Sequence, residues 1–213
     1  MICTRCGDTF TVSPSVAERF PGWTPSLCAS CHKTSAAPDS PKKPAKQKAR
    51  PATAPATSLE DALTRFSDGP TSGVFTDGSA QPNPGPGGWG AVYVKNNAII
   101  DQRYGHEPHT TNNRMELQAL FAATELVEHG EPAVIYTDSK LAVDTVNTWA
   151  ASWEKRGWKR KTGPVENLDL VRPLFETFRS RPELSLQWIA AHSGYRWNEY
   201  ADALSTAWAR DTL

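Results

Sequence analysis

The sequence predicts an α/β domain with a mixed β-sheet. Two observations support this class: short β-branched and aromatic runs typical of strands, and longer amphipathic stretches whose apolar residues recur at helical spacing. The order of these elements is a third observation, because three strands come first and helices then alternate with two more strands. That order favours a mixed sheet with helices packed against it.

We expect strands at residues 74–76, 91–94, 98–100, 133–137 and 184–191. We expect helices at residues 115–127, 141–153, 168–179 and 197–210. In the first of these helices, apolar residues recur every three or four positions from Leu117 to Val127. Asn112 or Asn113 can cap its start, and Gly130 can follow its end.

A glycine-rich turn joins the first two expected strands, in the segment GVFTDGSAQPNPGPGGWG at residues 73–90. Its Gly85-x-Gly87-x-x-Gly90 spacing is that of a dinucleotide-binding loop, but such a loop needs a helix directly after the glycines. Residues 91–94 are β-branched and aromatic and predict a strand instead. We therefore expect a hairpin here and no dinucleotide cofactor.

Composition divides the chain into three parts. Residues 1–33 contain all four cysteines, and residues 69–213 show the globular pattern described above. Between them, residues 34–68 predict a flexible linker, because residues 34–58 lack aromatic and large aliphatic side chains and cannot bury enough apolar surface to fold. The basic residues of this linker either contact a polyanion or only keep the tether soluble.

Charge is unevenly distributed along the chain, although the formal net charge is zero. Residues 1–58 hold eight Lys or Arg against three Asp or Glu, whereas residues 59–213 hold fifteen against twenty. No apolar run reaches the roughly 18 residues of a membrane span, and the N-terminus lacks the apolar core of a secretory signal. We therefore expect a cytoplasmic protein that does not bind membranes.

Four acidic residues occupy comparable positions. Asp77 and Asp138 each follow an expected strand, Glu116 lies in the first turn of a helix, and Asp202 lies on the last helix. Singly, each is explained by a turn, a cap or a helix dipole. Together, at one edge of a sheet, they would repel one another unless divalent cations with oxygen ligands bound them. This pattern predicts a two-metal site for phosphoryl chemistry.

The motifs FTDGS, NPGPGGWG, TTNNRMEL, YTDS and AHSGYRWNEYAD follow one another over residues 72–211. In order and spacing they resemble the motifs of type 1 ribonuclease H. The resemblance implies a ribonuclease H-like fold, with a mixed five-stranded sheet flanked by helices. It also implies hydrolysis of the RNA strand of RNA–DNA hybrids with two Mg²⁺ ions, or Mn²⁺ in their place, giving 5′-phosphate and 3′-hydroxyl ends.

Carried over by position, the resemblance implies that Asp77, Glu116, Asp138 and Asp202 are the catalytic metal ligands. His192, in the loop after the last strand, would assist proton transfer or product release. Glu116 is also placed to sense the 2′-hydroxyl that distinguishes RNA from DNA.

The resemblance further implies that Asn83, Asn112 and Asn113 contact the substrate through its minor groove. The glycines of the hairpin would let the backbone approach that groove. Ala80 and Lys140 depart from the family pattern, and at the second position the family commonly has Gln. A lysine there can reach a phosphate instead.

The segment WEKRGWKRK at residues 153–161 combines tryptophan with positive charge. It contains Trp153, Lys155, Arg156, Trp158, Lys159, Arg160 and Lys161. Such a run is often only a solvated face, and tryptophans at helical spacing are often core. The segment also resembles the basic protrusion that grips the DNA strand in some members of the family. Because it offsets an otherwise acidic domain, we predict that it binds substrate.

The cysteines form two pairs, Cys3-x-x-Cys6 and Cys28-x-x-Cys31, separated by 21 residues. In a reducing compartment this spacing predicts a tetrahedral Cys₄ zinc ribbon, whose metal would supply most of the stability of so short a segment. Cys28-x-x-Cys31-His32 also fits a c-type haem attachment site, and disulfides or an iron–sulfur centre stay open. Three roles stay open for this module: binding nucleic acid, docking a protein, or a purely structural role.

Two other functions remain open. A non-catalytic adaptor for RNA–DNA hybrids would keep the fold, although a pure binder has no need of four mutually repelling carboxylates. A DNA-directed nuclease of the same fold, such as a junction resolvase or integrase, is disfavoured by TTNNRMEL and the basic segment. We expect a monomer that binds an RNA–DNA hybrid.

Overall fold

The computed structural model describes residues 1–4, 6–12, 18, 24, 26, 28 and 57–210. They belong to two units, an N-terminal one and a C-terminal α/β domain, which are described separately. The predicted boundary between residues 33 and 34 lies outside the described residues, as does most of the predicted linker. Among the described residues, no helix combines the length and apolar character of a membrane span.

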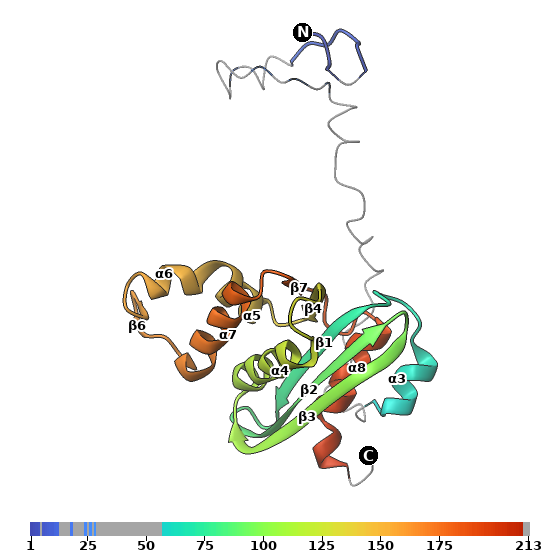
Figure 1. Ribbon diagram of the computed structural model, residues 1–213, viewed down its shortest axis with the longest axis vertical. Coiled ribbons are helices and arrows are strands. Elements are labelled where there is room, and N and C mark those ends of the chain that lie inside the picture. The colour runs from blue at the N-terminus through green and yellow to red at the C-terminus, as the bar shows by residue number, and fades with distance from the viewer. Residues whose placement is uncertain are drawn as a thin grey trace. The chain divides into compact units, whose positions relative to one another are not determined.

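A five-stranded mixed sheet forms the centre of the α/β domain, with strand order β3-β2-β1-β4-β7 (Figure 1). The strands are β1 (Gly73–Ala80), β2 (Gly85–Lys95), β3 (Ala98–Thr110), β4 (Ala133–Thr137) and β7 (Leu184–Trp188). The first three form an antiparallel meander, β4 lies parallel to β1, and β7 lies parallel to β4. This confirms the predicted mixed five-stranded sheet and the expected hairpin.

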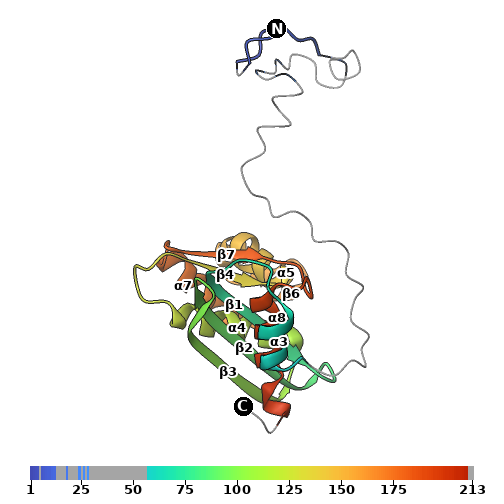
Figure 2. The same cartoon turned by 90° about the vertical axis from the view of Figure 1, so that its right-hand side faces the viewer.

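Helices cover both faces of the sheet (Figure 2). They are α3 (Leu59–Arg65), α4 (Asn112–Leu126), α5 (Lys140–Asp144), α6 (Ala150–Glu154), α7 (Leu168–Ser180) and α8 (Arg196–Ser205). Neighbouring residues of β1 serve the two cores: Val74 packs in the cluster with α4 and α7, and Phe75 packs in the cluster with α8. Because both faces of the sheet are covered, β1 is buried over nearly its whole length, although only Val74 and Phe75 form an apolar run in it.

Several elements differ from expectation. Strands β1 and β2 are longer than expected, β7 ends at Trp188, and α8 ends at Ser205. Strand β3 runs to Thr110, well past residue 100, because as an exposed edge strand it is largely polar and carries no apolar pattern. The expected helix 141–153 is interrupted by a π-helical segment, η1 (Thr145–Trp149), between α5 and α6. Helix α4 is capped by Thr111, whose side chain accepts a hydrogen bond from the Arg114 amide, so the caps predicted at Asn112 and Asn113 are wrong.

Helix α3 lies within the range predicted as linker. Ser58 caps it by accepting a hydrogen bond from the Asp61 amide, and Ala62 is fully buried in the core beside α8. The Arg196 side chain also donates a hydrogen bond of 2.6 Å to the Phe66 carbonyl oxygen. The predicted linker end at residue 68 is therefore too late. The sequence pattern missed α3 because a helix of seven residues is too short to show a clear period.

Beyond α6 the chain forms a small protrusion. Two short strands, β5 (Lys159–Arg160) and β6 (Gly163–Pro164), pair as a hairpin before α7. After α8, a 3₁₀ turn, η2 (Ala207–Ala209), ends the described chain apart from Arg210.

Candidate active site

Two acids meet where α4 crosses β1. Asp77 lies on β1, and a Cβ added to the next residue, Gly78, would come under 3.0 Å from the backbone of Met115 and Glu116. Only glycine allows this backbone contact between the strand and the helix. The start of α4 is thereby placed directly over β1, with Glu116 beside Asp77. Glu116 lies in the second turn of α4, because the helix begins at Asn112, so the prediction that it lies in the first turn is wrong.

A second close contact places α8. Cβ atoms added at Gly88 and Gly90 of β2 would come under 3.0 Å from backbone atoms of Ser205 and Ala201. Helix α8 therefore lies flat against β2, which brings Asp202 to the site. The interpretation that these two glycines serve the approach of nucleic acid is wrong, since the space beside them holds α8.

The third acid follows β4. Asp138 comes directly after Thr137, the last residue of that parallel strand, and Ser139 then caps α5 by accepting a hydrogen bond from the Ala142 amide. The indole of Trp188, at the end of the neighbouring β7, donates a hydrogen bond of 2.9 Å to the Asp138 carbonyl oxygen. The backbone that carries Asp138 is thus held from both sides.

The carboxylates of Asp77, Glu116 and Asp138 form one cluster, with one oxygen from each lying within 4.8 Å of the others. Asp77 is only 8 % exposed. Burial, followed by the charges of Asp138 and Asp202, raises the pKa of the Asp77 carboxyl well above its ordinary value. Burial, followed by Asp77 and Asp138, does the same to the pKa of Glu116. The cluster is a set of carboxylate oxygens from one buried and two half-buried residues, and oxygen donors of this kind are the ligands that Mg²⁺ and Mn²⁺ prefer.

Asp202 and His192 adjoin this cluster. Ligand atoms of His192, Glu199 and Asp202 also lie within 4.8 Å of one another. Burial raises the pKa of the Asp138 carboxyl, and the nearby His192 partly opposes that effect. His192 is exposed and adopts a left-handed backbone with φ of 47°, an uncommon conformation often found at functional sites. All five predicted catalytic residues therefore gather at one edge of the sheet.

Two residues of α8 join the site without having been predicted. Asn198 is 1 % exposed, and its side chain forms a hydrogen bond with Asp138 that lowers the pKa of that carboxyl. Glu199 is buried and accepts a hydrogen bond of 3.4 Å from the Gly194 amide, in the loop after His192. Both lie about one turn before Asp202 on α8, and this helical spacing was the available signal.

The predicted substrate-binding asparagines differ in their surroundings. The Asn112 side chain accepts a hydrogen bond of 2.7 Å from the Ala80 amide, and the Asn112 amide donates one of 3.2 Å to the Asn83 side chain. These two residues brace the β1–β2 turn against α4. Asn113 is exposed and lines a groove between α4 and the protrusion.

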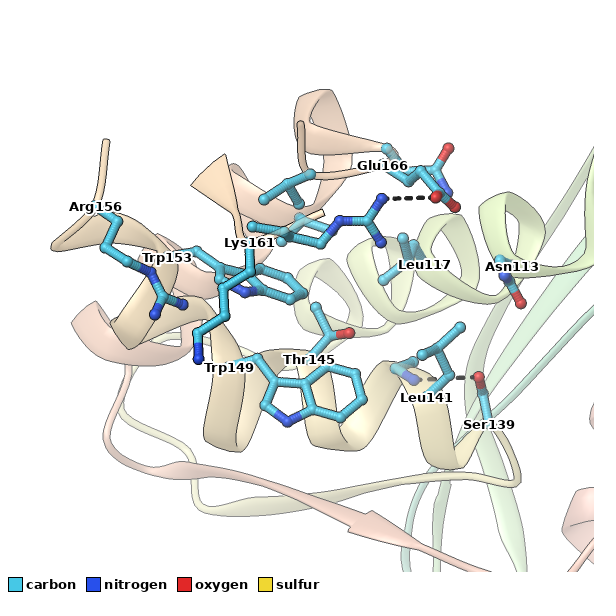
Figure 3. A pocket seen from close by; sticks show the side chains of 15 residues that line it. Asn113, Leu117, Ser139, Leu141, Thr145, Trp149, Trp153, Arg156, Lys161 and Glu166 are labelled. Carbon is cyan, nitrogen blue, oxygen red and sulfur yellow. Dashed lines mark hydrogen bonds and ion pairs between the residues drawn. The ribbon is translucent and has the colours of Figure 1, made fainter. Parts of the chain in front are cut away.

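This groove encloses about 380 Å³. Figure 3 shows Trp149, Trp153, Arg156 and Lys161 gathered at one end of it and Asn113 at the other. Leu117 and Val171 contribute an apolar floor. Aromatic faces beside positive charge suit a polynucleotide backbone and its bases or sugars.

The remaining residues of the basic segment take several positions. Arg160 lines the groove but donates to Glu166 at 2.8 Å, and Lys155 and Lys159 are exposed outside the groove lining. Trp158 is half-buried, lies edge-on to Phe175 and packs against the core. Lys140 is 72 % exposed at the start of α5, with Asp144 3.4 Å away.

In the N-terminal unit, the described cysteines come together. Sγ atoms of Cys3, Cys6 and Cys28 lie within 4.8 Å of one another, and Cys31 lies outside the described residues. Cys3 and Cys6 belong to a small turn in which the Gly7 amide donates to the Cys3 carbonyl oxygen at 3.0 Å. The Cys28 amide donates to Cys3 Sγ at 3.3 Å, the kind of hydrogen bond that supports a metal-binding thiolate.

A mixed sheet with buried carboxylates at its edge, beside a groove of tryptophan and positive charge, defines a metal-dependent nuclease. Residues 70–210 match the family model of RNase H, and the chain belongs to the ribonuclease H family. This confirms the resemblance drawn from the motifs and the enzyme class that it implies.

Relatives of known name agree. The chain is 44 % identical over 133 residues to a ribonuclease H of Alcanivorax borkumensis, covering 62 % of this chain and 87 % of that protein. It is 41 % identical over 143 residues to a ribonuclease H of Hahella chejuensis, covering 66 % and 94 %. Among solved structures, LC9-RNase H1, described as a type 1 RNase H with the type 2 active-site motif, matches with a TM-score of 0.52 and 32 % identity, covering 68 % of this chain and 76 % of that one.

Proposed function

We propose that this protein is an endonuclease that hydrolyses the RNA strand of RNA–DNA hybrids and leaves 5′-phosphate and 3′-hydroxyl ends. The observation that carries the proposal is the cluster of Asp77, Glu116 and Asp138, with ligand oxygens within 4.8 Å of one another. This cluster lies in a chain whose relatives are named ribonuclease H.

Asp77, Glu116, Asp138 and Asp202 would hold two Mg²⁺ or Mn²⁺ ions, because all four offer hard carboxylate oxygens and three already converge. When bound, the ions supply positive charge to the scissile phosphate and to the attacking and leaving oxygens. The exposed imidazole of His192, next to Asp138, would move a proton at the departing 3′ oxygen. The reaction requires no protein nucleophile.

The experiment that tests this proposal uses a 5′-labelled RNA strand annealed to DNA, with Mg²⁺, and compares the native protein with Asp138→Asn. RNA cleavage by the native protein alone supports the proposal. If neither protein cuts and both bind the hybrid, the chain is an adaptor. A labelled DNA duplex is the control substrate, and its cleavage would instead indicate a DNA-directed nuclease. Light scattering of the same sample tests the expected monomer.

The groove beside the active site is expected to bind the DNA strand. Arg156 and Lys161 line it, and neutralising each should reduce the slope of log affinity against log salt by about 1. Hybrid binding by Arg156→Gln and Lys161→Gln is measured in Ca²⁺ at several salt concentrations. Lys95→Gln is the control, since Lys95 is also an exposed lysine but lies on β2, pairs with Glu131 and does not line the groove. Equal slopes for the groove variants and the native protein would contradict the assignment.

For the N-terminal unit, we propose that Cys3, Cys6 and Cys28, together with Cys31, hold one structural zinc ion. Convergence of three sulfurs within 4.8 Å supports this site. The 3.8 Å separation of Cys6 Sγ and Cys28 Sγ is well beyond the roughly 2.05 Å of a disulfide bond. Elemental analysis of the full chain should find about one zinc per chain, and Cys6→Ser should lose most of it, because a tetrahedral site then lacks a ligand. Iron, haem absorption or cysteines linked in pairs would overturn the assignment.

A further inference from the structure

Ser205 ends helix α8 at the point where this helix lies against β1 and β2. The residue is fully buried, and its Oγ lies 2.6 Å from Asp77 Oδ2. The Asp202 carbonyl oxygen, one turn earlier on the helix, lies 2.9 Å from the same Oγ. Ser205 therefore contacts two proposed metal ligands: the carboxylate of Asp77 and the backbone carbonyl of Asp202.

The hydroxyl carries a single proton, so it cannot donate to both acceptors at once. The 2.6 Å distance to Asp77 falls in the range of a charge-assisted O–H···O⁻ bond, which is stronger than a neutral one. Asp77 is therefore the preferred acceptor. Ser79 Oγ, 3.5 Å away, can in turn interact with Ser205 Oγ.

A hydroxyl at this position has a cost that its neighbours avoid. Three nearby buried residues, Ala201, Ala203 and Ala207, present only methyl groups. A buried hydroxyl is unfavourable unless it is hydrogen-bonded, and alanine would fill most of the same space. The hydroxyl of Ser205 is thus accounted for by its bond to Asp77.

The support behind Ser205 is rigid. A Cβ at Gly88 would come under 3.0 Å from the Ser205 carbonyl oxygen, so the helix backbone is in direct contact with β2 at this residue. An aspartate has two side-chain torsions, and a bond from a fixed donor to one carboxylate oxygen restricts both. The direction of the other oxygen is then fixed as well.

We propose that Ser205 is a positioning residue that orients the Asp77 carboxylate for divalent cation binding before the cation arrives. This inference rests on the proposed function, because it assigns a support to one of the proposed metal ligands. Loss of such a support typically costs about 10- to 100-fold in metal affinity.

The test measures Mg²⁺ affinity directly, by NMR titration of the full chain without substrate, together with the melting temperature. Ser205→Ala is expected to bind Mg²⁺ about 10- to 100-fold more weakly than the native protein, because its Asp77 carboxylate can rotate. Thr206→Ala is the matched control: Thr206 also bonds the Asp202 carbonyl oxygen, at 3.2 Å, but no described hydrogen bond joins it to Asp77. It should retain native affinity.

Native Mg²⁺ affinity in Ser205→Ala would overturn the inference, whatever happens to the melting temperature, because the residue would then serve packing alone. If Ser205→Ala does not fold, Ser205→Cys replaces it, and this weaker donor is expected to show an intermediate loss of affinity. Native affinity in that variant would overturn the inference equally. Failure of the native protein to cut a hybrid would contradict the proposed function and would be seen separately from these affinities.

Discussion

Asp77→Asn is expected to reduce RNA cleavage by roughly 10³-fold or more, a loss comparable to removing a principal electrostatic group from an active site. The same substitution should stabilise the metal-free protein. Asp77 is buried beside Asp138 and Asp202, and burial together with their charges opposes its ionisation. A neutral amide of nearly the same shape relieves that repulsion. We expect the free energy of unfolding to rise by about 1 kcal/mol or more, which raises the melting temperature by roughly 2–4 °C for each kcal/mol.

Cleavage assays and calorimetry in buffer without added Mg²⁺ measure the two effects on the same samples. Glu128→Gln, which neutralises an exposed acid, is the control and should change neither quantity. Added Mg²⁺ should raise the melting temperature of the native protein more than that of Asp77→Asn, because the cation binds the folded state. A variant that loses activity and also melts earlier than the native protein would contradict the explanation by repulsion.

The stability of the metal-free protein should depend on pH in a defined direction. Burial and neighbouring charges raise the pKa values of Asp77, Glu116 and Asp138 in the folded state. Above the ordinary carboxyl pKa of about 4, the folded protein therefore binds more protons than the unfolded chain. Lowering the pH through these raised pKa values should therefore stabilise the folded state, and this stabilisation is lost as the pH rises through them again. The advantage of Asp77→Asn should accordingly shrink as the pH falls.

The catalytic acids could be predicted because each follows from local pattern and chain order. Asp77 and Asp138 come directly after apolar runs, and the parallel pairing of β1 with β4, which sets Thr76 opposite Thr137, brings the two acids together. Glu116 and Asp202 could be predicted because they lie in the motifs TTNNRMEL and AHSGYRWNEYAD, whose order and spacing along the chain resemble those of type 1 ribonuclease H. The sequence pattern could not give the packing partners, because these depend on contacts between distant residues.

Ser205 illustrates that limit. It lies 128 residues from Asp77 along the chain, and nothing in its neighbourhood separates it from an ordinary helical serine. The same holds for Gly88 and Gly90 of β2. Glycine is required at these positions because the backbone of α8, more than 100 residues later in the chain, packs directly against them. The missed length of β3 and the missed helix α3 have a different cause, since β3 is largely polar beyond residue 100 and α3 is too short to show a clear period.

Gly78→Ala is expected to destabilise the domain by about 3 kcal/mol, near the upper end for overpacking, and to lower its melting temperature by roughly 10 °C. The added methyl group would come under 3.0 Å from backbone atoms of Met115 and Glu116. Backbone atoms cannot rotate away as a side chain does, so α4 as a whole must shift from β1. Because the backbone nitrogen of Glu116 is one of these contact atoms, the shift would also move the Glu116 carboxylate, and RNA cleavage should fall together with stability.

Gly105→Ala is the matched control for this prediction. A Cβ there also comes under 3.0 Å from its neighbours, but all three nearest atoms belong to the Trp89 side chain, which can adjust. Calorimetry should therefore show a smaller loss, about 1 kcal/mol or less, and cleavage close to native. If both variants melt alike and both cut the hybrid, the backbone contact does not determine where Glu116 lies. If only Gly78→Ala loses stability and activity, the closeness of α4 to β1 is what assembles the acid cluster.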